Sequence, residues 1–146
     1  MITNDVQHRN TKSWLARFES DAVDLEQQHP AAERTRLQQL QIDAARSQAD
    51  DLRRELVEYE RLRSGEERTF AASTLRGIAE LLIKARVARG WSQRRLADEL
   101  GIAEQQVQRY EATGYSAASL ARLTDIADAL GMTVTETATL NTVSAA

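Results

Sequence analysis

Residues 92–111 read SQRRLADELGIAEQQVQRYE, and this stretch decides the fold of the chain. Ser92 predicts the start of a helix over residues 93–100, because a serine hydroxyl can accept a hydrogen bond from a free amide of the first turn. Gly101 predicts a tight turn with positive φ, which glycine adopts at little steric cost. A second helix is expected over residues 103–112. The stretch therefore predicts two short helices joined by one glycine turn.

The apolar residues of this stretch predict that the two helices cross at a steep angle. The small side chain of Ala97 lets the second helix approach closely, and Ile102 enters the core directly after the turn. Two further helices, expected over residues 74–89 and 119–130, carry apolar faces that can close the unit. The expected internal contacts are Leu96, Ala97, Leu100, Ile102 and Val107.

Residues 83–134 resemble the phage repressor/Cro (Xre) class of helix-turn-helix domains. The matching positions are Arg86, Ser92, Gln93, Leu96, Ala97, Leu100, Gly101, Ile102, Val107, Glu111 and the Ala129-Leu130-Gly131 ending. The resemblance implies a DNA-binding domain of four to five helices over residues 74–131, in which Arg86 and Glu111 form a structural ion pair. The helical N-terminal segment ending in Glu-Tyr-Glu also resembles that of some bacterial Xre-type regulators.

Two features depart from that family. Its members usually have Ser or Thr where Ala103 stands, and losing a capping side chain costs about 0.5–2 kcal/mol. The loop over residues 111–119 is also one residue longer than the commonest form. We expect both departures to alter phosphate contacts near the second helix of the motif.

The exposed polar residues of the two central helices predict the DNA contacts. Glutamine can bond to adenine in a bidentate manner, arginine to guanine, and a carboxylate to the cytosine amino group. Gln93 is expected to donate to phosphate or to brace the start of the recognition helix, and Glu104 either accepts from cytosine or complements the helix dipole. The predicted DNA-binding residues are Gln93, Arg94, Arg95, Glu104, Gln105, Gln106, Gln108 and Arg109.

The charges are distributed unevenly along the chain. The formal net charge is −3. Residues 1–73 contain 11 Lys+Arg and 14 Asp+Glu, whereas residues 74–146 contain 8 of each. The segment 81–97 has no acid but five basic residues, Lys84, Arg86, Arg89, Arg94 and Arg95. Phosphate binding needs such a local basic patch rather than a basic chain, although a solvated helix face has the same pattern.

Residues 1–65 predict an antiparallel, coiled-coil-like helical hairpin. Its helices are expected over residues 4–28 and 31–64, with the turn at His29-Pro30, and residues 66–73 form a linker. The second helix has an apolar seam at heptad spacing, which we expect to mediate dimerisation. Alternatively, this helix folds back on its own DNA-binding unit, or the acidic hairpin holds a different protein. The seam residues are Ile42, Ala45, Ala49, Leu52, Leu56 and Tyr59.

Residues 132–146 predict a short C-terminal strand or a tail. The Thr- and Val-rich alternation over residues 133–140 favours a strand, whose free edge can pair with another copy. The alternative is a frayed tail. Residues 141–146 are expected to be disordered.

The composition argues against several classes of protein. Cysteine is absent, and no apolar run approaches the roughly 20 residues of a membrane span. The two histidines, His8 and His29, are isolated, and no nucleophile stands near a base. We therefore expect a cytoplasmic, all-α protein that is no enzyme and has no catalytic residue, cofactor, metal site or membrane contact.

The sequence favours a DNA-binding regulator, most simply a repressor. Acting as a homodimer, or as a tetramer, it would read a two-fold symmetric operator on double-stranded DNA. The first alternative is an antitoxin whose hairpin neutralises a basic toxin while the domain regulates its own operon. The second alternative is a protein-interaction scaffold that does not bind DNA.

Overall fold

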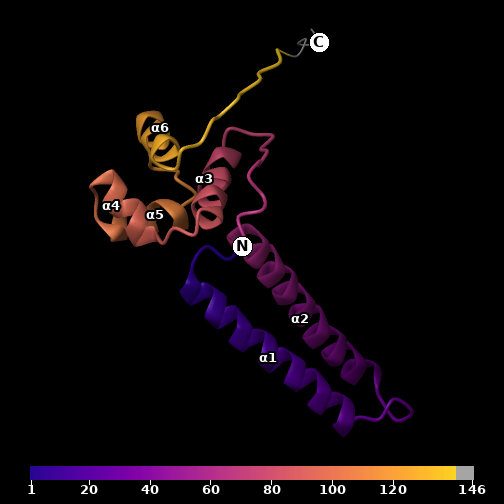
Figure 1. Cartoon of the computed structure of the whole chain (residues 1–146). Coiled ribbons are helices and arrows are strands. Elements are labelled where there is room, and N and C mark those ends of the chain that lie inside the picture. The colour runs from indigo at the N-terminus through magenta and orange to yellow at the C-terminus, as the bar shows by residue number, and fades with distance from the viewer. Residues whose placement is uncertain (141–146) are drawn as a thin grey trace.

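The computed structural model describes residues 1–140, and these form six helices and no strand. Figure 1 shows the long helices side by side, with the shorter helices gathered at one end of the pair. The expected disorder of residues 141–146 lies outside the described residues. The helices are α1 (Asp5–Gln28), α2 (Arg36–Arg63), α3 (Gly77–Ala88), α4 (Gln93–Leu100), α5 (Glu104–Ala112) and α6 (Leu120–Ala129). The all-α prediction is confirmed.

Side-chain caps set the start of both long helices. Asn4 accepts a hydrogen bond from the Gln7 amide at 2.9 Å, so α1 begins at Asp5. In α2, Thr35 and Gln38 form a reciprocal capping box, in which each side chain accepts from the other's backbone amide. The expected helix start at residue 31 was wrong, because this capping box delays the helix by five residues.

The apolar seam of α2 is buried inside the hairpin. Ile42, Ala49, Leu56 and Tyr59 are all buried against α1, and the other two seam residues are partly buried. The first helix of the same chain therefore occupies the surface that the sequence analysis assigned to a second copy. The heptad spacing was a correct sign of helix pairing, and α1 covers most of the seam within one chain.

The N-terminus joins the hairpin to the short helices. Ile2 is buried in a cluster with Leu56, Tyr59, Leu62 and Val87, which come from α2 and α3. The backbone oxygen of Thr3 accepts a hydrogen bond from Arg86 in α3 at 2.7 Å. Residues 1–3 thus contact both the hairpin and the short helices and connect the two parts of the molecule.

The four short helices enclose their own core. Leu82, Leu96, Val107, Ile126 and Leu130 are almost completely buried in it. Residues 133–140 leave this unit as an extended segment that is not a strand (Figure 1). The expected strand is therefore absent from the described chain, because residues 1–140 supply no other strand to pair with it.

Candidate nucleic-acid interface

The turn between α4 and α5 follows the local sequence closely. The Ser92 hydroxyl accepts a hydrogen bond from the Arg95 amide at 3.0 Å and caps α4. Gly101 ends that helix with φ of 64°, in the left-handed region that favours glycine. At the start of α5, Ala103 has the extended backbone of a cap residue but makes no capping side-chain bond. The first turn of α5 consequently has no capping side-chain acceptor.

A buried ion pair holds α3 against the end of α5. Arg86 and Glu111 are 1% and 8% exposed. Arg86 donates from Nε to Glu111 Oε1 at 2.5 Å and from Nη2 to Oε2 at 2.7 Å. It also donates to the carbonyl oxygens of Trp91 and Thr3, both at 2.7 Å. This arrangement ties the guanidinium to four points, so it fixes the angle at which α5 is presented.

Gln93 belongs to the same network. Its Nε2 donates to Glu111 Oε2 at 2.7 Å, so its side chain is directed toward the end of α5. Glu104, which Gln93 was expected to brace, instead accepts a weaker bond from Gln108 Nε2 at 3.3 Å. Gln93 therefore joins the start of α4 to the end of the recognition helix rather than to its beginning.

The predicted DNA-contacting side chains lie on α4 and α5, and most are exposed. Arg95 stacks over the Trp91 ring, 5.3 Å from its centroid, and pairs with Glu99. Gln106 is only partly exposed. Within residues 1–140, the side chains of Arg94, Gln105 and Arg109 are exposed and make no hydrogen bond or ion pair. These three are thus the most available groups for an external acceptor.

Tyr115 is a structural residue of this region that the sequence analysis missed. It has a positive φ of 57° although it is not glycine, and its ring stacks on Tyr110 at 5.7 Å. Burial, together with the nearby Glu111 carboxylate, raises the pKa of its hydroxyl well above the usual range. Tyr115 anchors the loop between α5 and α6, and an aromatic residue inside a glycine-containing loop was the available sign.

The described helices contain no metal-binding cluster of three or more His, Asp or Glu side chains. None of them is long and apolar enough to cross a membrane.

Comparison with known families identifies the short-helix unit. Residues 82–136 match the family model of helix-turn-helix domains, which confirms the resemblance to the Xre class. No curated protein and no solved structure matches the chain. A domain of this class supports a general role in DNA-binding transcription regulation, and the hairpin lies outside the matched residues.

Proposed function

We propose that the protein is a sequence-specific transcriptional regulator that binds a two-fold symmetric operator as a dimer and represses transcription there. The observation that carries this proposal is the exposed polar row on α5, held in place by the Arg86–Glu111 pair. Helices of this kind enter the major groove with their N-terminal residues toward the bases. Occupying a promoter in this way blocks polymerase, which is the simplest route to repression.

The residues divide into base readers and phosphate binders. Gln105 and Gln108 suit adenine, Glu104 suits the cytosine amino group, and Arg109 suits guanine or a phosphate. Arg94, at the start of α4, has an exposed guanidinium that can bind a DNA phosphate. Gln93 gives one amide hydrogen to Glu111 and retains a second, which is available for a phosphate oxygen. Arg95 pairs with Glu99 and stacks on Trp91, and Gln106 is only partly exposed, so both take lesser roles.

The test is a fluorescence-anisotropy titration of the full chain with duplex from the promoter of its own gene. The titration is run at two salt concentrations, with scrambled duplex as competitor. We expect competitor-resistant binding that weakens with salt, because phosphate contacts release counterions. Gln105→Ala with Gln108→Ala should lower specific affinity at least about tenfold, since a bidentate base contact is worth about 1–3 kcal/mol.

The matched control is Gln41→Ala with Gln48→Ala, which removes two exposed glutamines from α2. This variant should bind like the wild type. Equal affinity of the wild-type protein for promoter and scrambled duplex would contradict operator recognition.

An antitoxin is the second candidate function. It is favoured by the projecting hairpin (Figure 1), whose half of the chain has three more acids than bases. In that case, a basic protein encoded beside this gene would bind the hairpin of the purified full chain and leave bound DNA in place. Failure of the two proteins to form a complex in a mixing experiment would remove this candidate.

A further inference from the structure

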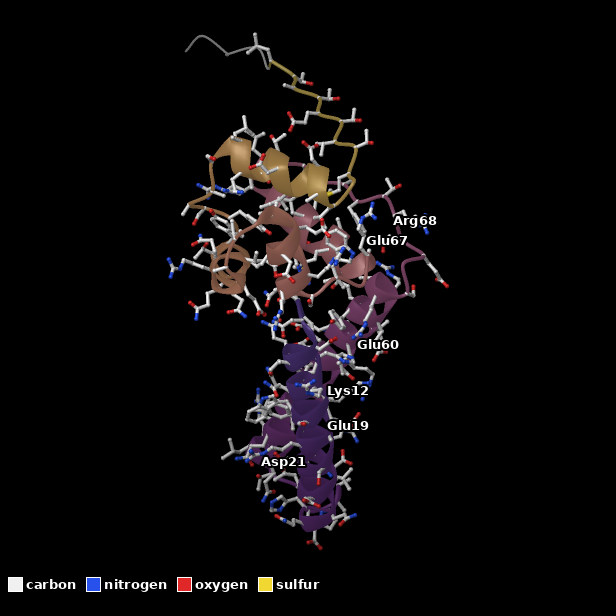
Figure 2. The ribbon with its side chains drawn as sticks, turned by 60° about the vertical axis from the view of Figure 1, so that its left-hand side comes forward. Lys12, Glu19, Asp21, Glu60, Glu67 and Arg68 are labelled. Carbon is white, nitrogen blue, oxygen red and sulfur yellow. The ribbon has the colours of Figure 1, made fainter. Side chains whose placement is uncertain are left out.

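Charged residues on one flank of α1 are matched by residues of α2. Lys12 lies 3.3 Å from Glu60, and Glu19 lies 2.5 Å from Arg53. Glu26 pairs with Arg46 in the same way. Figure 2 labels Lys12, Glu19 and Glu60 along this part of the hairpin. Ion pairs thus join the two helices on this flank, beside the buried seam.

A second stripe on α1 has the same kind of spacing but no matching helix. Its members follow one another by four and three residues in alternation, so they lie along one face of the helix. All six are exposed, and its charged members form no ion pair within residues 1–140. The stripe consists of Asn10, Trp14, Arg17, Asp21, Asp24 and Gln28.

Trp14 is the apolar anchor of this stripe. Half of its surface is exposed, although tryptophan is usually well buried. The Arg17 guanidinium lies 5.5 Å from the centroid of the Trp14 ring, and the Phe18 ring lies 6.3 Å away. Tryptophan and arginine, with tyrosine, are enriched among the residues that contribute most of the binding energy at protein interfaces.

We propose that this stripe is a self-association surface, on which α1 packs against α1 of a second copy in antiparallel orientation. The spacing of the stripe is the same in both directions, so a two-fold axis that crosses it midway between Arg17 and Asp21 matches every member. Arg17 then faces Asp21 of the second copy, Trp14 faces Asp24, and Asn10 faces Gln28. Each contact occurs twice, as a closed two-fold dimer requires.

The charges favour a second copy over an unrelated protein. A partner of one charge sign would leave either Arg17 or Asp21 opposed by a like charge, whereas a second copy matches both. The Trp14 indole N–H can donate to the Asp24 carboxylate, so the remaining acid also gains a partner.

The same arrangement suits the proposed function. The inference rests on that function only for the biological purpose of the dimer. At a rise of about 1.5 Å per residue, the starts of the two α1 helices would lie about 42 Å apart. This is of the same order as the roughly 34–36 Å that separates two recognition helices on one face of DNA.

The test measures self-association of the full chain by sedimentation equilibrium without DNA. We expect the wild type to dimerise, and Arg17→Glu or Asp21→Arg alone to weaken the dimer at least about tenfold by opposing like charges. An equimolar mixture of the two variants should regain association, because the heterodimer restores both opposite-charge contacts. Arg9→Glu, which changes an exposed residue of α1 outside the stripe, should leave the dimer intact.

The proposed surface would be overturned by a wild type that stays monomeric, or by a dimer that neither variant weakens. A mixture that fails to associate would also overturn it. Because the measurement contains no DNA, operator binding in the anisotropy titration can succeed or fail independently.

Discussion

At the scale of single residues, Glu111 and Arg86 determine how the recognition helix is held. Glu111 accepts three hydrogen bonds, two from Arg86 and one from Gln93. Arg86 has further acceptors in the backbone oxygens of Thr3 and Trp91. A buried charge is tolerated only when it is paired and hydrogen-bonded in this way. These residues therefore position α5 rather than read DNA themselves.

Replacing Glu111 by alanine should lower stability and DNA affinity together. The change leaves Arg86 buried without its counter-ion, which costs about 3–5 kcal/mol in comparable buried pairs. We expect a lower melting temperature in thermal denaturation and weaker binding in the anisotropy titration. Glu104→Ala, at an exposed position of the same helix, should change the melting temperature little. An unchanged melting temperature for the Glu111 variant would contradict this role.

At the scale of elements, the ends of the helices depend on individual caps. Thr35 caps the start of α2 and Ser92 caps the start of α4. In each case the side-chain oxygen accepts a hydrogen bond from a backbone amide of the first turn. Helix α5 lacks such a cap because Ala103 stands at that position. Its backbone there, with φ of −70° and ψ of 142°, already has the cap conformation. A hydroxyl group is therefore the only missing part.

Supplying that hydroxyl should stabilise the domain. Ala103→Thr and Ala103→Val introduce side chains of the same shape, of which only threonine can accept an amide hydrogen bond. We expect the threonine variant to be more stable than the valine variant by about 1 kcal/mol, the usual contribution of a helix cap. Chemical denaturation of both variants checks this difference. Identical unfolding midpoints would show that α5 gains nothing from a side-chain cap.

At the scale of the whole molecule, the N-terminus couples the hairpin to the DNA-reading unit. Ile2 fills the cluster at their junction, and the neighbouring Thr3 carbonyl accepts from Arg86. Phe70 of the linker packs against this cluster and against the core of the short helices. The orientation of the hairpin is therefore set by packing at this junction and not by the linker alone.

Shortening Ile2 to alanine should loosen that junction. Removing buried methyl groups from an aliphatic side chain of this size costs about 2–5 kcal/mol, and we expect the lower part of this range at a chain terminus. Thermal denaturation and limited proteolysis of the linker measure the effect. Val6→Ala provides the control, because Val6 is exposed nearby in α1. Equal destabilisation by the two substitutions would mean that Ile2 has no special part in the coupling.

Local sequence by itself determined the short helices and the turn between α4 and α5. Helix α4 has the predicted bounds, and Gly101 has the predicted positive φ. Both depend on a cap or a backbone conformation that a few neighbouring residues decide. The same holds for the spacing of the α2 seam, which correctly indicated that this helix pairs with another.

Only the tertiary structure decided which surfaces meet. A heptad seam has the same spacing whichever helix covers it, so the sequence did not distinguish α1 from a second copy as its partner. The side chain of Gln93 joins Glu111, and the carbonyl of Thr3 joins Arg86, across long separations in the chain. Local periodicity contains no information on such contacts, because they depend on how the finished helices dock.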